Sequence, residues 1–175
     1  MEPELEMQTS MGRPVVEVFA SWASADASTA KAFWALLGEA LAIDASYAFK
    51  LWSFDEALCV GERWDTEIQT ALSRAHLGIL ALSPAFLNSR YIRDVELPAF
   101  VGDEVRGRRV VPVLLKPLPA TADLRGLADH QIFRHPNLGR PRAAFSQAGA
   151  GKDLWVHALV REIHEVLSRY GSIVG

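Results

Sequence analysis

The chain has 175 residues, of which 50% are hydrophobic and 22% are charged, values typical of one ordinary soluble globular domain with a full core. Its formal net charge of −3 excludes the strongly basic surface that binding to nucleic acid or an anionic membrane requires. Its single cysteine, Cys59, excludes an internal disulfide and favours a reducing compartment, and no apolar run is long enough to span a bilayer.

The ends of the chain suggest leader and tail segments around one domain. The first residues, MEPELEMQTSMGR, are acidic and contain no apolar signal segment, so we interpret residues 1–13 as a disordered leader and expect a cytoplasmic location. Residues 14–170 form the predicted domain and residues 171–175 a short tail. We also allow for a C-terminal sensor or oligomerisation domain that is missing from this chain.

Four short, nearly continuous apolar runs predict strands that are covered on both faces. In chain order they are 15–21 (VVEVFAS), 47–54 (YAFKLWSF), 76–83 (HLGILALS) and 109–115 (RVVPVLL). Helical patterns lie between and after them at 27–41, 64–75, 84–104 (with an interruption) and 153–170. A weak fifth strand is placed at 130–135, and residues 136–150 are interpreted as an irregular surface loop.

This alternation of strands and helices predicts an α/β fold with a parallel sheet and helices on both faces. In such sheets, ligands bind at the carboxyl ends of the strands, where the winding direction reverses. For five strands in the order 2-1-3-4-5, that crevice lies between the first and third strands. The segment FASWAS (19–24) ends the first strand, and the segment after the third strand carries Glu96, so both are expected to face this crevice.

Glu96 is an unusual residue for its place in a predicted helix. Four apolar residues share one helix face with it at three- and four-residue spacing: Ile92, Val95, Ala99 and Phe100. A carboxylate among core residues is costly unless another group pairs with it or the protein uses it. Two interpretations of Glu96 therefore stay open, a functional carboxylate and the partner of an arginine in an ion pair.

Capping residues and a proline divide the segment around Glu96. Ser83 is predicted to cap a helix that has Pro84 at its first position, and Ser89 to cap the next segment. Pro98 removes a helical hydrogen bond two residues after Glu96. We therefore expect a kink beside Glu96.

Three motifs occur in order along the chain: VFASWASAD (18–26), WSFDEALCVGERW (52–64) and LGILALSPAFLNSRYIRDVEL (77–97). Together they resemble a Toll/interleukin-1 receptor (TIR) domain of the bacterial NAD-cleaving type over about residues 14–170. The second motif matches the BB loop of that family through Asp55, Leu58, Gly61 and Trp64. Trp22 stands where the family usually has tyrosine or histidine.

The resemblance implies a flavodoxin-like, three-layer fold and one of two functions. Some TIR domains are non-enzymatic adaptors that assemble through homotypic contacts. Others cleave NAD⁺ to nicotinamide and ADP-ribose or a cyclic isomer, using a glutamate in the helix after the third strand, and Glu96 aligns with it. In this second interpretation the protein acts in bacterial immune, anti-phage signalling, with NAD⁺ as substrate and no further cofactor. A deoxyribosyltransferase-like enzyme is a remote third alternative.

The resemblance also predicts the residues around the catalytic Glu96. The expected substrate-binding residues are Phe19, Ala20, Ser21, Trp22, Trp52, Asp55, Trp64, Ser83, Tyr91 and Ile92. The expected contacts to other copies of the chain, in a homo-oligomer or filament, are Leu58, Cys59, Val60 and Gly61. Structural roles remain alternatives for several of them: Trp22 as a core ring, Asp55 and Gly61 as turn residues, and Trp64 as packing beneath its helix. The five histidines show no metal-ligand spacing, and no metal is expected.

Overall fold

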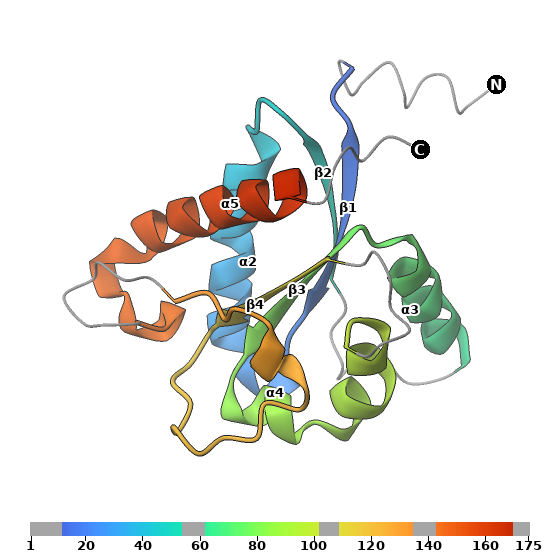
Figure 1. Ribbon diagram of the computed structural model, residues 1–175, viewed down its shortest axis with the longest axis vertical. Coiled ribbons are helices and arrows are strands. Elements are labelled where there is room, and N and C mark those ends of the chain that lie inside the picture. Colours follow the sequence, from blue (N-terminus) through green and yellow to red (C-terminus); the bar gives the residue numbers. More distant parts are fainter. Residues whose placement is uncertain (1–11, 54–61, 102–108, 135–142, 170–175) are drawn as a thin grey trace.

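The computed structural model describes residues 12–53, 62–101, 109–134 and 143–169, without the side chains of residues 62–65 and 129. Four parallel strands form one sheet in the spatial order β2-β1-β3-β4 (Figure 1). They are β1 (Val15–Ser21), β2 (Ala48–Ser53), β3 (Leu77–Leu82) and β4 (Arg109–Leu114). The prediction of a parallel α/β fold is confirmed for these strands and their order.

Helices and short helical turns connect the strands. The α-helices are α2 (Ala27–Ala42), α3 (Glu62–Arg74), α4 (Pro84–Asn88) and α5 (Lys152–Arg169). A π-helix, η3 (Ile92–Glu96), follows α4. The 3₁₀ turns are η1 (Ser24–Asp26), η4 (Leu97–Ala99), η5 (Leu127–Asp129), η6 (Phe145–Gln147) and η7 (Gly149–Gly151). Among the helices in the described ranges, none combines the length and the hydrophobicity that a membrane span requires.

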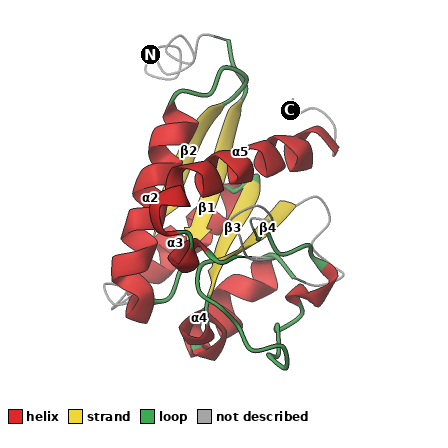
Figure 2. Ribbon diagram, turned by 90° about the vertical axis from the view of Figure 1, so that its left-hand side faces the viewer, coloured by secondary structure: helices red, strands yellow, loops and turns green. Residues whose placement is uncertain are grey.

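Two hydrophobic clusters, one on each face of the sheet, make up the core. Val16, Val18 and Ala20 of β1 pack with α2 and α5, whereas Phe19 of the same strand packs with α3, α4 and the segment after it. This alternation follows from the two-residue period of a strand. Figure 2, viewed from the side of α2 and α5, shows the strands running behind these two helices. The sheet therefore has helices on both faces, as predicted.

The predicted fifth strand is reduced to a single bridge within the described residues. Phe133 forms a parallel bridge with Val113 of β4. Its N–H donates to the carbonyl of Pro112 at 2.7 Å, and its own carbonyl accepts the N–H of Leu114 at 3.0 Å. Phe133 thus lies next to β4, where the order 2-1-3-4-5 would place the fifth strand, but residues 130–134 do not form a strand.

The expectation of a surface loop at 136–150 is wrong for its described part. Phe145 is fully buried, and its ring centroid lies 5.3 Å from that of Phe33 in α2 and 5.5 Å from that of Trp155 in α5. The indole N–H of Trp155 donates to the carbonyl of Ala143 at 3.1 Å, which fixes the backbone next to Phe145. Phe145 and Ala148 of this segment therefore belong to the core between α2 and α5.

Candidate functional site

The carboxyl ends of the parallel strands meet at one edge of the sheet, and polar residues gather there. β1 ends at Ser21 and β2 at Ser53, while Ser83 follows β3 directly and Lys116 follows β4 by two residues. The chain after β3 returns to this edge with Glu96, which contacts Ser21. We call this region the carboxyl edge.

Glu96 is the last residue of the π-helix η3. The N–H of Leu97 donates to the carbonyl of Ile92, five residues earlier, which is the spacing of a π-turn. Pro98 has no N–H to continue this ladder, and the chain tightens into the 3₁₀ turn η4. The predicted kink beside Glu96 is present as a change from a π-turn to a 3₁₀ turn. Such π-turns occur frequently at functional sites.

The apolar face predicted around Glu96 is only partly as expected. Ile92 and Phe100 are 1% and 3% exposed, but Val95 and Ala99 are only half-buried. The prediction assumed regular α-helical spacing, and the wider π-turn rotates the residues after Ile92 relative to that spacing. Glu96 itself is 5% exposed, so its carboxylate lies within the protein.

A hydrogen bond joins Glu96 to the end of β1. The hydroxyl of Ser21, which is 1% exposed, donates to Glu96 Oε2. These residues lie 75 positions apart in the chain, so only the fold brings them together. A hydroxyl that donates to one carboxylate oxygen fixes the orientation of that carboxylate. The predicted catalytic residue and one predicted substrate-binding residue are therefore direct neighbours.

A second buried carboxylate, Asp26, lies at the carboxyl edge. Lys116 Nζ is 2.6 Å from Asp26 Oδ1, and the hydroxyl of Ser83 donates to Asp26 Oδ2. Ser83 also accepts the N–H of Phe86 at 3.0 Å, which caps α4 as predicted. This network links the chain after β1, β3 and β4. Ser83, predicted as a substrate-binding residue, is thus placed between a buried carboxylate and a helix end.

The two tryptophans predicted for the pocket belong to different core clusters. Trp22 is 6% exposed, packs with α2 and α5, and donates from its indole N–H to Ser53 Oγ at 3.1 Å. Trp52 is half-buried and packs on the other face of the sheet, with the Lys50 ammonium 4.8 Å from its ring centroid. The structure therefore does not bring both rings into one described pocket.

The remaining described residues of the predicted pocket pack in the two core clusters. Phe19 and Ala20 are fully buried in β1 and face opposite sides of the sheet. Tyr91 and Ile92 pack in the same cluster as Phe19. Ile92 is the first residue of the π-helix, and Tyr91 precedes it. Phe19, Tyr91 and Ile92 thus pack on the face that carries α3 and α4, and Ala20 packs on the face that carries α2 and α5.

The BB loop lies outside the described residues. This concerns Asp55, Leu58, Cys59, Val60 and Gly61, and also the side chain of Trp64. Their roles in substrate binding and assembly stay predictions.

An apolar cavity of about 250 Å³ lies between the end of β2 and α3. It is lined by Trp52, Thr66, Glu67, Thr70, Ala71 and Arg74. Neither Ser21 nor Glu96 lines this cavity, so it is separate from the carboxylate that the sequence singled out.

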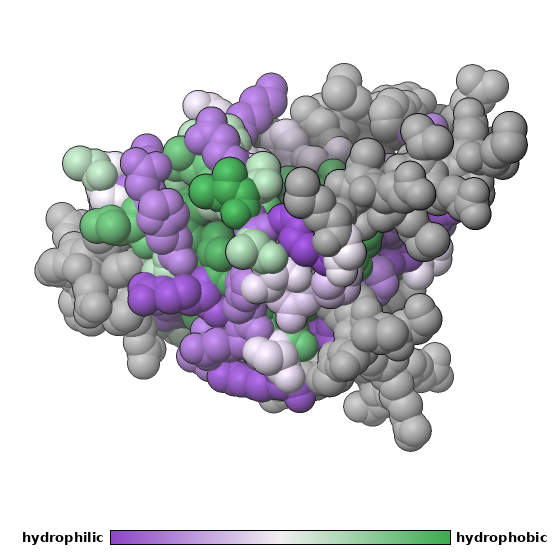
Figure 3. Space-filling model, turned by 90° about the horizontal axis from the view of Figure 1, so that it is seen from above, coloured by the Kyte–Doolittle hydropathy of each residue, from purple (hydrophilic) through white to green (hydrophobic). Residues whose placement is uncertain are grey.

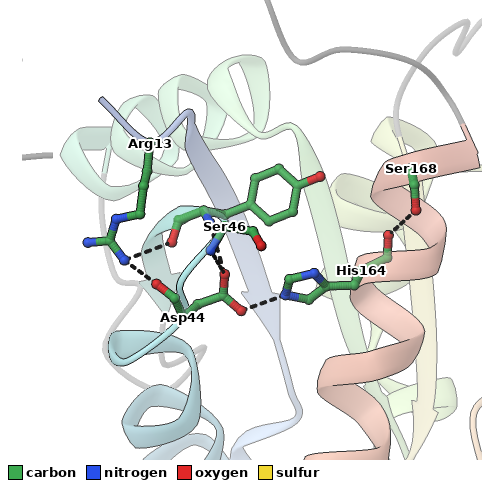
Figure 4. A network of polar contacts seen from close by, with 6 residues as sticks. Arg13, Asp44, Ser46, His164 and Ser168 are labelled. Atoms are coloured by element: carbon green, nitrogen blue, oxygen red, sulfur yellow. Dashed lines mark hydrogen bonds and ion pairs between the residues drawn. The ribbon is translucent and has the colours of Figure 1, made fainter. Parts of the chain in front are cut away.

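The opposite end of the sheet carries a cluster that the sequence did not predict, shown in Figure 4. Asp44, before β2, places its Oδ2 2.5 Å from His164 Nε2 in α5, and its Oδ1 accepts the backbone N–H groups of Ser46 and Tyr47 at 2.9 and 2.8 Å. The Arg13 guanidinium, before β1, donates to the Asp44 carbonyl. We call Arg13, Asp44 and His164 the amino-edge cluster.

The pKa of the Asp44 carboxyl reflects two opposing effects. Burial alone would raise the pKa of the Asp44 carboxyl, but the bonds from His164 and from the N–H groups of Tyr47 and Ser46 outweigh it and hold this pKa below its ordinary value.

The view from above, onto the end of the molecule where β2 begins and α5 ends, shows hydrophobic side chains bordered by hydrophilic ones (Figure 3).

Sequence reasoning missed both polar networks for the same reason. Lys116 and Asp26 are 90 positions apart, and Asp44 and His164 are 120 apart, so no local spacing connects either pair. The one usable signal was positional, because Lys116 comes just after a predicted strand and Asp26 just after the FASWAS segment. In the part of the chain that the structure describes, no three histidine, cysteine, aspartate or glutamate side chains gather as metal ligands would.

Comparison with protein families gives a match. A protein-family model described as TIR domain matches residues 18–147, which include β2, β3, β4, the larger part of β1, the π-helix and both polar networks of the carboxyl edge. Among curated proteins, none matches the chain significantly.

Proposed function

Because the chain belongs to the TIR domain family, we propose that it cleaves NAD⁺ at the bond between nicotinamide and ribose. The observation that carries this proposal is the buried carboxylate of Glu96, held by the Ser21 hydroxyl at the carboxyl edge of a parallel sheet. Ligands of open parallel sheets bind at this edge, beside the point where the winding direction reverses. In the order β2-β1-β3-β4, that point lies between β1 and β3, the strands that lead to Ser21 and to the segment of Glu96.

The cleavage of NAD⁺ can be catalysed by one carboxylate near the ribose. The bond from ribose C1′ to the nicotinamide nitrogen breaks with its electron pair on nicotinamide, which leaves as a neutral molecule and needs no general acid. The ribose becomes an oxocarbenium-like cation, and a fixed negative charge nearby stabilises it, as carboxylates do in glycoside hydrolysis. Water then bonds to C1′ and releases a proton, giving ADP-ribose, or an adenine nitrogen bonds to it and gives a cyclic isomer.

Ser21 contributes to this function by positioning the carboxylate. Its hydrogen bond fixes Glu96 Oε2 relative to the end of β1. Electrostatic stabilisation of a transition state depends on groups that are fixed in place before the reaction begins. Asp26, Ser83 and Lys116 support the same edge by joining the ends of three strands.

The proposed setting is bacterial immune signalling, in which copies of the domain associate. The apolar run Leu58, Cys59 and Val60 in the sequence supports association, because such residues are costly to leave exposed to water. If association completes the site, specific activity should rise faster than linearly with protein concentration. Leu58→Asp should remove that rise, and equal specific activity across concentrations would argue against association.

The test is to incubate the purified protein with NAD⁺ and to quantify released nicotinamide by chromatography over a range of protein concentrations. We expect release by the parent protein, release by Asp94→Asn, and almost none by Glu96→Gln. Asp94 is a matched control, because its carboxylate lies on the same π-helix but is exposed. Absence of release at every concentration would overturn the proposal in favour of the adaptor function. Equal release by the parent and Glu96→Gln would show that Glu96 is not the catalytic residue.

A further inference from the structure

The residues just after Glu96 rest directly on the backbone of two glycines. A Cβ atom added to Gly78, the second residue of β3, would lie 2.6 Å from Phe100 Cε1 and within 2.9 Å of two other ring atoms. A Cβ added to Gly126 would lie 2.7 Å from Val101 Cγ1. Real Cβ atoms do not approach other atoms so closely, so both positions require the absence of a side chain.

Gly78 creates a slot on the face of the sheet that carries α3. In the strand register, Gly78 is opposite Phe19 of β1 and Val110 of β4, and both of these side chains pack in the cluster on this face. The Phe100 ring, 3% exposed, lies over the glycine with its centroid 5.8 Å from that of Phe19. A glycine inside a strand weakens the strand, and its usual reason is the close approach of another group, which here is the Phe100 ring.

Gly126 is the second glycine against which a side chain packs. Its φ of +86° is in the left-handed region, which favours glycine for a separate reason. The Val101 side chain occupies the space that a side chain at 126 would need. Phe100 and Val101 thus insert into different parts of the fold, the sheet and the turn before η5, although they are neighbours in the chain.

Backbone hydrogen bonds connect Phe100 and Val101 to the turn that carries Glu96. The N–H groups of Phe100 and Val101 donate to the carbonyl of Leu97 at 2.9 and 2.8 Å, and Leu97 is bonded to Glu96 in the chain. The N–H of Leu97 in turn closes the π-turn on Ile92. A displacement of the Phe100 ring therefore also displaces Glu96, because one tight turn connects the two residues.

We propose that Gly78 and Gly126 are positioning residues for Glu96: they seat Phe100 and Val101 and thereby determine where the Glu96 carboxylate lies. This inference rests on the proposed NAD⁺ cleavage for its catalytic consequence, but its structural part does not. A π-turn followed by a proline has fewer regular hydrogen bonds to define its geometry than an α-helix has, so packing beyond the turn must define it. A displacement of about 1 Å at a reacting group can cost about 10²-fold in rate.

The first experiment is Gly78→Ala, which pushes the Phe100 ring away from β3. We expect kcat for NAD⁺ cleavage to fall about 10- to 100-fold while KM changes little, because the carboxylate moves relative to C1′ more than the binding surface changes. The matched control is Ile79→Val, which alters the next residue of β3 on the opposite face, away from Phe100. We expect this control to lower the melting temperature and to leave kcat unchanged.

A compensating change makes the test specific. In Gly78→Ala/Phe100→Leu, the smaller side chain makes room for the added methyl group, and we expect kcat to recover at least in part. General destabilisation cannot produce recovery, because Phe100→Leu on its own removes core volume and should lower stability. Gly126→Ala should also lower kcat, through Val101.

Hydrogen exchange provides a readout that needs no NAD⁺. In Gly78→Ala, the amides of Leu97, Phe100 and Val101 should exchange faster than in the parent, and the double variant should restore slow exchange. If the parent protein releases no nicotinamide, the proposed function fails, and the exchange result still decides whether the glycines position the Glu96 segment. If Gly78→Ala does not fold, Phe100→Leu tests the same contact. If the amide exchange and the kcat of Gly78→Ala, or of Phe100→Leu in its place, equal those of Ile79→Val, the inference is overturned.

Discussion

Glu96 at the carboxyl edge and Asp44 in the amino-edge cluster are both enclosed carboxylates, at opposite ends of the same sheet. The Asp44 carboxylate receives two backbone N–H groups and the His164 ring, and the Arg13 guanidinium fixes the carbonyl of the same residue. Glu96 ends a π-turn and receives the neutral Ser21 hydroxyl.

The difference between the two carboxylates is one of local structure and place. Asp44 joins the chain before β1, the turn before β2 and α5, and bonds between such distant segments hold a fold together. Glu96 lies in an irregular turn at the edge where parallel sheets bind ligands. We therefore expect the amino edge to serve structure and the carboxyl edge to serve function, so substitutions at the first should change stability and substitutions at the second should change activity.

The largest expected effect is on activity at the carboxyl edge. Glu96→Gln keeps the size of the side chain but removes the charge, and loss of one preorganised electrostatic group lowers kcat by about 10²- to 10³-fold or more. The melting temperature of Glu96→Gln should equal that of the parent or exceed it, because a buried carboxylate that is kept for function lowers stability.

The opposite result for Glu96→Gln would reverse the assignment. If an arginine pairs with Glu96 for structural reasons, the substitution leaves a buried cation without its partner and costs about 3 to 5 kcal/mol of unfolding free energy. Thermal unfolding monitored by circular dichroism, compared with Asp94→Asn, distinguishes the two cases.

The next effect concerns the hydroxyl that holds the carboxylate. Ser21→Ala removes the donor to Glu96 Oε2, and we expect kcat to fall about tenfold, the equivalent of about 1.4 kcal/mol for one hydrogen bond to a charged group. Ser168→Ala is the matched control at the amino edge. It also removes a hydroxyl donor, because Ser168 Oγ donates to the His164 carbonyl. Steady-state kinetics of both should show a loss in Ser21→Ala alone. Equal kcat values in Ser21→Ala and the parent would argue against this positioning role.

The corresponding change at the amino edge should affect stability and not activity. Asp44→Asn keeps an acceptor for the backbone N–H groups but weakens the bond to His164, which should cost about 1 to 2 kcal/mol and lower the melting temperature by about 2 to 8 °C. Asp123→Asn, in an exposed pair with Arg125, is the control and should change little. A loss of nicotinamide release in Asp44→Asn below its melting temperature would contradict the assignment.

The sequence predicted what depends on local spacing. Strand positions agree with the structure because short apolar runs reflect burial on both faces, and Glu96 was noticeable because one charge interrupted an apolar face. Phe145 was missed because its burial depends on Phe33 and Trp155, and nothing near it in the chain indicates these partners. The π-turn could not be predicted either. An α-helix and a π-turn use the same residue types, and the choice here depends on where Ser21, Phe100 and Val101 hold the segment.

The smallest expected effect is on the pH dependence of stability, and it concerns Asp44. The pKa of this carboxyl is lowered from its ordinary 3.8 in the folded protein, so the unfolded chain binds a proton at a higher pH than the folded chain does. The stabilisation is therefore complete above the unfolded-state pKa, near 3.8, and is lost as the pH falls through the lower folded-state value. In urea unfolding between pH 3 and pH 6, the parent should lose stability more steeply below about pH 4 than Asp44→Asn, because the variant has no proton to bind at this site. Nicotinamide release measured in the same series should not differ in pH dependence between the two proteins, because Asp44 lies at the opposite end of the sheet from Glu96. Parallel stability curves for the two proteins would show that the bonds around Asp44 do not favour its charged form, and the amino edge would then lose its structural assignment.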